Sequence, residues 1–289
     1  TGDNNVATGA YALFYNQTGS DNTAFGTQAM QGASGNSHSN NTSVGASSLY
    51  SITTASANVA IGKQSLYSTT TGGSNTALGH QAMYYGTESD SNVAVGKSAL
   101  EKNVTGDDNT AIGYQSQYGA SNQSHSSNTS VGYRSLYAVT TGSSNIAIGK
   151  NSLNSGTTVT SNVAVGALAL SNNISGNYNT AVGQSCLLTN TNSFMTAVGY
   201  NALRLNAGGG ANVGFGYNAG YGNDSGSNNT YVGYEAGKGV SNNANSNNTG
   251  VGKDALKAIT TGGSNVALGA DSATSLTTQT TNVIIGASS

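Results

Sequence analysis

The sequence predicts an all-β protein: a parallel β-solenoid (β-roll) of about seventeen coils of 17 residues each, forming one repetitive domain over residues 1–289. Three observations lead to this prediction. A glycine recurs at a nearly fixed interval along the whole chain, the same residue types surround each copy, and the segment before it alternates with the period of a strand. Self-similarity at a fixed period is typical of solenoid proteins.

The recurring glycine, which we call the anchor glycine, defines each coil. Successive anchors lie 17 residues apart, with one step of 16 and three of 19. Four residues before the anchor stands Asn, as in Asn58, Asn75, Asn92 and Asn109, and the one exception is Met195. We expect both positions to be structural. The anchors are Gly9, Gly26, Gly45, Gly62, Gly79, Gly96, Gly113, Gly132, Gly149, Gly166, Gly183, Gly199, Gly216, Gly233, Gly252, Gly269 and Gly286.

The segment before each anchor is the predicted strand. Counting from the anchor, position −3 is β-branched, −2 is usually Ala or Ser, and −1 is almost always large and apolar, as in residues 75–79 (Asn-Thr-Ala-Leu-Gly). Successive side chains of a strand point to opposite faces. We therefore expect positions −3 and −1 to face the interior, and the small residue at −2 to face outward with the anchor.

The segment after each anchor completes the coil. Position +3 is Ala, Ser or Cys and +4 is usually Leu or Met, so we expect a second short strand that ends at this Leu. A polar loop such as residues 70–74 (Thr-Thr-Gly-Gly-Ser) then returns the chain to the next Asn. Its residue types favour turns. The longer steps contain inserts at residues 32–39 and 119–126 and after Gly233. We expect these inserts to bulge from one edge.

Stacking is needed because one coil cannot bury its own apolar face. Parallel stacking at about 4.8 Å per strand predicts a rod of roughly 80 Å for seventeen coils. The chain contains no Pro, which fits, since Pro removes a donor from the strand ladder. Both ends cut through a repeat, so we expect the chain to be part of a longer fibre or to stack end to end.

The composition excludes several classes of protein. Charged residues make up only 7% of the chain and the net charge is −2, so no basic face for nucleic acid is expected. No run of about 18 apolar residues exists, and we expect no membrane insertion. Cys186 is the single cysteine and cannot form an internal disulfide.

The small residues at position −2 suggest how chains associate. A smooth face of Ala, Ser and Gly would let another backbone approach closely, and we interpret it as a flat subunit interface of a parallel homotrimer. The alternative is a flattened monomeric solenoid in which small residues simply fit a thin coil.

Residues 74–83 (Ser-Asn-Thr-Ala-Leu-Gly-His-Gln-Ala-Met) and 227–237 (Ser-Asn-Asn-Thr-Tyr-Val-Gly-Tyr-Glu-Ala-Gly) resemble repeats of bacteriophage tail fibres and the head repeats of trimeric autotransporter adhesins. The resemblance covers essentially the whole chain. It implies a trimeric, extracellular or virion-borne β-roll that contacts a cell surface. The 17-residue step is longer than that of the adhesin heads, and no anchor, coiled-coil stalk or terminal chaperone segment is present in the sequence.

Tyrosine recurs at two positions of the coil. Stacked coils would align these residues into two stripes, and Tyr suits binding at a wet surface because it joins an apolar ring to a polar tip. We predict contact with cell-surface glycans, and the alternative is that stacked rings only stabilise neighbouring coils. The tyrosines are, at +1, Tyr114, Tyr133, Tyr200, Tyr217 and Tyr234, and, at +5, Tyr50, Tyr67, Tyr84, Tyr118, Tyr137 and Tyr221.

The histidines and the cysteine give little indication of a catalytic or metal-binding site. His38 and His125 occupy matching insert positions among Ser and Asn and are interpreted, like His80, as exposed loop residues. Cys186 stands where other coils have Ala or Ser and is expected to be a small packed side chain. No acid–base pair or nucleophile constellation recurs, so we expect no enzyme, no cofactor and no metal site.

The sequence therefore predicts a structural and adhesive extracellular fibre, such as a phage tail-fibre shaft on a virion or a surface adhesin in host attachment. One alternative is a self-assembling extracellular filament without a receptor. A second alternative is an ice-binding solenoid. Two features argue against it: Thr and Val are mixed irregularly at position −3, and we expect these side chains to face inward.

Overall fold

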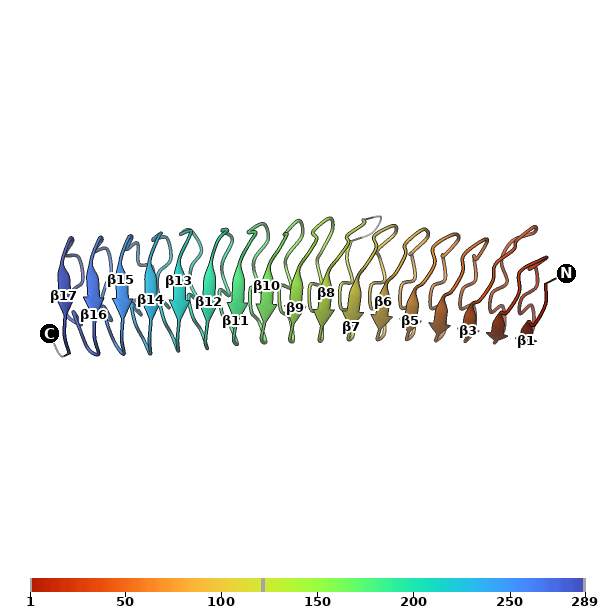
Figure 1. The fold of residues 1–289 in the computed structure, drawn as a ribbon, viewed down its shortest axis with the longest axis horizontal. Coiled ribbons are helices and arrows are strands. Elements are labelled where there is room, and N and C mark those ends of the chain that lie inside the picture. Colours follow the sequence, from red (N-terminus) through yellow and green to blue (C-terminus); the bar gives the residue numbers. More distant parts are fainter. Residues whose placement is uncertain (1, 121–122, 288–289) are drawn as a thin grey trace. The chain divides into compact units, whose positions relative to one another are not determined.

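The computed structural model describes residues 2–120 and 123–287. It comprises two compact units, Thr1–Ser144 and Asn145–Ser289. All regular structure in the described residues consists of three-residue strands, one in each coil (Figure 1). This confirms the predicted class, an all-β solenoid of coils about 17 residues long. The expectation of one domain over residues 1–289 stays a prediction.

Each strand of both units begins at position −3 and ends at −1. The first unit contains β1 (Val6–Thr8), β2 (Thr23–Phe25), β3 (Thr42–Val44), β4 (Val59–Ile61), β5 (Thr76–Leu78), β6 (Val93–Val95), β7 (Thr110–Ile112) and β8 (Thr129–Val131). The second contains β9 (Ile146–Ile148), β10 (Val163–Val165), β11 (Thr180–Val182), β12 (Thr196–Val198), β13 (Val213–Phe215), β14 (Thr230–Val232), β15 (Thr249–Val251), β16 (Val266–Leu268) and β17 (Val283–Ile285).

Consecutive strands within each unit pair in parallel and in register. Val59 lies beside Thr76, and Thr76 lies beside Val93, so the same coil position repeats along the sheet. In the second unit Val163 pairs with Thr180 in the same way. The stacking on which the sequence interpretation depended is therefore present in both units.

The predicted orientation of the strand faces is wrong. The middle residue of the strand is buried, as Ala60 and Ala77 show, while its neighbours at −3 and −1 are partly or fully exposed. The reason is the turn after the anchor, whose Leu or Met at +4 fills the interior, as Leu66 and Met83 do. Only a small side chain fits opposite these residues: a Cβ added at Gly214 would lie 2.8 Å from Cγ of Leu203.

The predicted second strand after the anchor is also wrong, because the backbone there forms turns. Positions +2 and +4 have positive φ throughout, as in Gln64 (58°) and Leu66 (49°). This left-handed conformation is especially unfavourable for β-branched residues. Position +4 accordingly carries Leu or Met in most coils, and none of its residues is Val, Ile or Thr.

The asparagines at −4 form a buried ladder along each unit. The Oδ1 atom of Asn75 accepts hydrogen bonds from the backbone N–H of Asn92 (2.9 Å) and from its Nδ2 (3.1 Å). The same Nδ2 also donates to the carbonyl oxygen of Gly106, which fastens the returning loop (3.0 Å). One side chain thus satisfies groups in three segments, which explains why Asn recurs there.

The anchor glycine is required by close backbone contact and by its conformation. Gly79 has φ of 142°, and a Cβ at this position would lie 2.6 Å from the carbonyl oxygen of Gly96 in the next coil. Any larger residue would therefore push the coils apart.

The inserts combine an exposed tip with buried anchoring residues. In the first, residues 33–35 are exposed, whereas Asn36 and His38 are buried and Asn36 forms a bridge to Asn16. Residues 121–122 of the second insert lie outside the described residues.

Candidate binding surfaces

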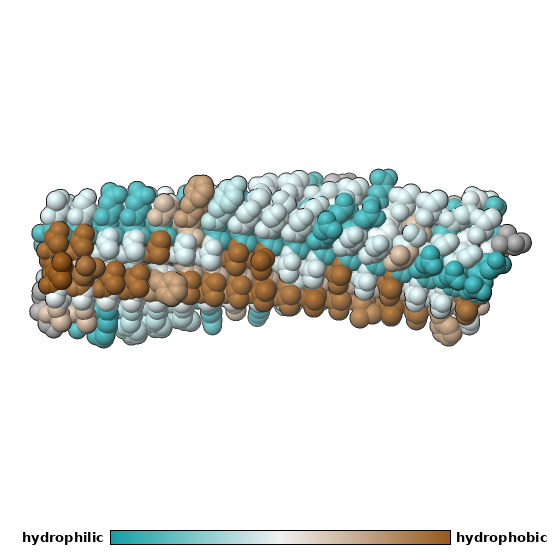
Figure 2. Space-filling view, in the orientation of Figure 1, coloured by the Kyte–Doolittle hydropathy of each residue, from teal (hydrophilic) through white to brown (hydrophobic). Residues whose placement is uncertain are grey.

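In each unit, the exposed side of the sheet carries a row of mainly apolar side chains, which we call the apolar ladder. It consists of the strand residues at −3 and −1. Ile61, Leu78 and Ile112 in the first unit are about two-fifths exposed, as are Ile146 and Ile148 in the second. Figure 2 shows these side chains as a brown band over the strands of each unit. Position −1 is apolar in every strand except at Thr8, position −3 is an irregular mixture of Thr, Val and Ile, and no charged residue occurs at either position.

The tyrosines at +1 form stacked groups that we call the +1 column. Tyr114 and Tyr133 stack with ring centroids 5.5 Å apart in the first unit. In the second unit Tyr217 stacks between Tyr200 (5.5 Å) and Tyr234 (5.1 Å). These five rings are between 38% and 50% exposed, so the column is accessible at the surface.

The tyrosines at +5 form a second set, the +5 column. Tyr67 stacks between Tyr50 (5.0 Å) and Tyr84 (4.8 Å), and Tyr118 stacks on Tyr137 (5.2 Å). Because the rings of both columns cover each other's faces, they present mainly their edges and hydroxyl groups to a ligand. The edge of an aromatic ring is electropositive.

Three cations lie against the tyrosines in the first unit. The Lys97 Nζ is 6.0 Å from the ring centroid of Tyr114, and the Lys102 Nζ is 4.5 Å from that of Tyr118. The Arg134 guanidinium lies 5.3 Å from the ring of Tyr133 and 5.0 Å from that of Tyr137. It therefore connects the +1 and +5 columns.

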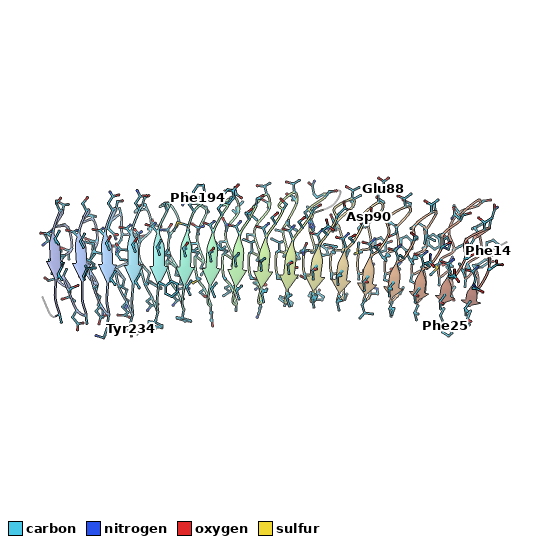
Figure 3. All side chains as sticks on the ribbon, in the orientation of Figure 1. Phe14, Phe25, Glu88, Asp90, Phe194 and Tyr234 are labelled. Atoms are coloured by element: carbon cyan, nitrogen blue, oxygen red, sulfur yellow. The ribbon has the colours of Figure 1, made fainter. Side chains whose placement is uncertain are left out.

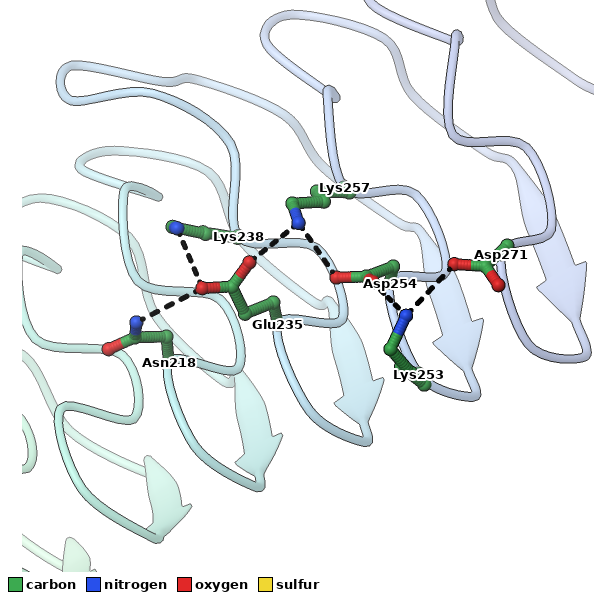
Figure 4. Close-up of polar contacts among 7 residues, drawn as sticks. All are labelled: Asn218, Glu235, Lys238, Lys253, Asp254, Lys257 and Asp271. Atoms are coloured by element: carbon green, nitrogen blue, oxygen red, sulfur yellow. Dashed lines mark hydrogen bonds and ion pairs between the residues drawn. The ribbon is translucent and has the colours of Figure 1, made fainter.

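The second unit neutralises most of the charges in the corresponding region (Figure 4). Glu235 accepts from Lys238 and Lys257, both at 2.7 Å. Asp254 pairs with Lys253 at 2.6 Å and with Lys257 at 3.0 Å. The hydrogen bonds to Glu235 and then Asp254 raise the pKa of Lys257 above its ordinary value, so the network stays charged at neutral pH.

The acidic residues of the first unit lie mostly at the opposite side of the coil. This unit has four basic and seven acidic side chains, and six of the acids precede the strand at positions −5 to −8; Glu101 is the exception. Figure 3 shows Glu88 and Asp90 at the loop side and Phe25 at the side where the strands end. Apart from Glu101, which stands at +5 between the coils of Tyr84 and Tyr118, the negative charges of this unit are separated from the positive ones.

The prediction of exposed loop histidines is wrong for His38 and His125, which are both buried; His80 is exposed. Burial lowers the pKa of each buried histidine from 6.5 to about 4. The Nδ1 atom of His38 faces Oδ1 of Asn22 at 3.5 Å, and the ring nitrogens of His125 have no hydrogen-bond partner among the residues that the structure describes. Both side chains are therefore neutral at pH 7.

Cys186 is a buried free thiol, which confirms its predicted packing role. Burial raises its pKa to about 12, and it donates a hydrogen bond to the carbonyl oxygen of Gly199. A neutral thiol of this kind is a poor nucleophile.

Two further findings concern the described residues. They bring no group of three or more His, Cys, Asp or Glu side chains together that could hold a metal ion. They also contain no helix with the length and apolarity needed to cross a bilayer.

Comparison with known proteins gives no family for the chain: no family model matches it, and no curated protein matches its sequence.

Sequence reasoning placed the tyrosines in columns but missed two surface features. It assigned the apolar ladder to the interior, because alternation alone does not say which face is buried. It also overlooked the cations beside the tyrosines, although Lys97 and Arg134 stand at +1 and +2 of their coils and could have been found by aligning coils by position.

Proposed function

We propose that the chain is a structural and adhesive extracellular fibre, in which several copies associate through their apolar ladders and present tyrosine columns to cell-surface glycans. A virion tail fibre and a bacterial surface adhesin are both fibres of this kind. The observation that carries the proposal is the apolar ladder, a long exposed row without charge. Monomeric soluble proteins rarely expose contiguous apolar patches beyond a few hundred Å².

The proposed assembly is a parallel homotrimer. The coil repeats along each unit, so ladders of parallel chains can meet in register over many coils and remove the same side chains from water. The interface differs from that expected from the sequence, since the meeting residues are those at −3 and −1 rather than the small residues at −2.

Light scattering tests the assembly. We expect the purified chain to have three times the mass of its 28.7 kDa subunit. The double variant Ile61→Lys/Leu78→Lys places two charges in the ladder and should yield smaller species. Thr71→Lys is the control, because Thr71 is exposed in the loop between the strands that contain Ile61 and Leu78. A wild-type mass of one subunit contradicts the proposal, whereas long filaments in electron micrographs favour the receptor-free alternative.

A glycan array tests the adhesive part of the proposal. We expect binding that falls when Tyr217→Ala removes the central ring of the three-membered +1 column. Tyr217→Phe retains the ring and separates the contribution of the hydroxyl group. If no glycan is bound, or if binding is the same in both variants and in the wild type, the columns serve only to stabilise neighbouring coils.

Ice binding is the second candidate, and one observation favours it: the rows of Thr and Val face outward, contrary to the expectation that weighed against this function. Both rows repeat once in each coil, although the −1 row contains Ile and Leu as well as Val and is interrupted by Phe25 and Phe215. A thermal-hysteresis measurement decides, and a value of zero removes this candidate.

A further inference from the structure

The two pairs Tyr114–Tyr133 and Tyr118–Tyr137, with the three cations Lys97, Lys102 and Arg134, form what we call the cation–tyrosine patch of the first unit. We propose that this patch binds an anionic glycan, a polysaccharide whose sugars carry carboxylate or sulfate groups. The proposal rests on the proposed function, because it assigns a ligand class to one part of the tyrosine columns.

The first argument is the placement of the cations. Arg134 lies between the two columns, Lys97 lies against one of them and Lys102 lies against the other. The Nε of Arg134 donates to Oε1 of Gln115 at 2.9 Å, which fixes the guanidinium in this position. Neither Lys97 nor Lys102 forms an ion pair in the part of the chain that the structure describes. Their ammonium groups are therefore available to an external anion.

The second argument is the orientation of the rings. Tyr118 and Tyr137 are nearly parallel, with 4° between their planes, and Tyr114 and Tyr133 deviate by 15°. Stacked in this way, they direct electropositive edges and hydroxyl donors outward, next to the ammonium and guanidinium groups. All three kinds of group favour an anionic ligand over a neutral one. Hydroxyl groups along a sugar chain can in turn donate to the phenolic oxygens.

The third argument distinguishes a glycan from a nucleic acid. Single-stranded nucleic acids bind chiefly by stacking bases on exposed aromatic faces. Each ring of the patch has one face against its partner ring, and a cation lies within 6.0 Å of each ring centroid. The first unit also has a net charge of −3, with four basic and seven acidic side chains. This charge disfavours any polyanion that binds by charge alone. A glycan also carries many hydroxyl groups, which can form hydrogen bonds with the phenolic groups beside the three cations.

The second unit provides a comparison within the same chain. Its +1 column of Tyr200, Tyr217 and Tyr234 lies beside cations that are paired with Glu235 and Asp254. Beside these pairs stands Arg204, whose Nη1 donates to the hydroxyl group of Tyr221 at 3.0 Å and whose guanidinium lies 5.8 Å from that ring. This region thus offers fewer cations to an external anion than the patch does. We therefore expect the anionic ligand to select the first unit.

Biolayer interferometry with the full chain tests the proposal on two pairs of immobilised polymers. Dextran sulfate is compared with neutral dextran, and polygalacturonate with its methyl ester. We expect the chain to bind at least one anionic polymer and not its neutral counterpart, with affinity that falls as salt is added. The two pairs distinguish recognition of sulfate from that of carboxylate.

Three variants locate the site. Lys97→Gln and Arg134→Gln should each weaken binding about tenfold, the factor that corresponds to one lost charged contact. Arg134→Lys should retain most of the affinity. The matched control is Lys253→Gln in the second unit, which removes a cation already paired with Asp254 and should change nothing. Thermal melting confirms that each variant is folded, and these surface substitutions leave the interior intact.

Several outcomes overturn the proposal. The proposal is wrong if the chain binds the anionic and neutral polymers equally. It is also wrong if binding of the anionic polymer is unchanged in Lys97→Gln and Arg134→Gln, or if Lys253→Gln weakens that binding as much as they do. Patch-dependent binding of immobilised oligo-dT with no binding of either anionic polymer assigns the patch to nucleic acid instead. If neutral glycans bind and Tyr217→Ala abolishes that binding, the proposed adhesive function stands while the anionic ligand is rejected.

Discussion

At the scale of single residues, the asparagine ladder shows how one side chain connects neighbouring coils. An Asn at −4 inside the ladder, such as Asn92, donates to the Asn of the previous coil and to a returning loop, and accepts from the next coil. Met195 is the one interruption. Its backbone N–H still bonds to Oδ1 of Asn179 (2.9 Å), but its thioether faces the N–H of Asn212 at 3.4 Å. Sulfur is a weak acceptor, so the ladder is poorly satisfied there.

We therefore expect Met195→Asn to raise the free energy of unfolding by about 1 kcal/mol, the net value of a typical hydrogen bond. Denaturant titration measures the change. The reverse substitution, Asn92→Met, should lower it by about 2 kcal/mol, because it leaves buried donors of Asn109 unpaired. If wild type and Met195→Asn are equally stable, the asparagine ladder sets the register between coils but does not stabilise the fold.

The buried histidines predict a dependence of stability on pH. Their pKa in the folded protein, about 4, lies below the ordinary value of 6.5. The unfolded chain thus binds protons first as the pH falls, and stability declines between about pH 6.5 and pH 4. Each histidine should cost about 2 kcal/mol at pH 5.

Denaturation at pH 7.5 and pH 5 tests this prediction with a matched pair of variants. His125→Asn introduces the residue that occupies the equivalent position, Asn245, in the second unit, and should remove about half of the decline. His80→Gln alters the exposed histidine and should leave the decline unchanged. A decline that is identical in both variants would assign the pH dependence to other groups.

At the scale of the coil, the alternation at −3, −2 and −1 identified the strand but could not reveal its buried face. That choice depends on the turn after the anchor, where Leu fills the interior and restricts −2 to a small residue. The sequence does contain a signal for this turn. None of the residues at +2 and +4 is Val, Ile or Thr, although these types are frequent elsewhere, and such an absence is expected where φ is positive.

The coil of β14 tests this interpretation, because it has a large residue at −2 and the smallest one at +4. Tyr231 stands at −2 and is fully buried, while +4 of the same coil is Gly237. A Cβ at Gly237 would lie 2.2 Å from the Tyr231 ring. The tyrosine hydroxyl donates to Oδ1 of Asn245. The aromatic ring therefore occupies the space that a Leu at +4 fills in other coils.

We expect Tyr231→Ala to destabilise the protein by about 3–5 kcal/mol, as is usual when a large buried side chain is truncated. Adding Gly237→Leu should recover most of this loss, since Leu at +4 is compatible with positive φ, as at Leu256 (53°). Gly237→Leu alone should be destabilising because it collides with the ring. Thermal melting of the three variants measures these effects. If the double variant is no more stable than Tyr231→Ala, the ring of Tyr231 does not occupy the space that Leu at +4 fills in other coils.

At the scale of the whole molecule, two sets of coil positions serve different purposes. Positions −4, −2, 0, +3 and +4 recur because they build the coil, and the sequence alone was sufficient to predict the solenoid from them. Positions +1, +2 and +5 vary from coil to coil, so periodicity located the tyrosines at +1 and +5 but not the side chains that contact them. The contact of Arg134 with Tyr133 and Tyr137 depends on side-chain directions and could only be found in three dimensions.

The apolar ladder leads to a final prediction, about the dependence of stability on concentration. If folded chains associate through the ladder, mass action favours the folded state, and the melting temperature should rise with protein concentration. Ile61→Lys/Leu78→Lys should weaken this dependence, whereas Thr71→Lys should preserve it. Differential scanning calorimetry over a hundredfold range of concentration provides the measurement. A wild-type melting temperature that stays constant would mean that the ladder remains exposed to water, and the proposed assembly would then lose its main physical support.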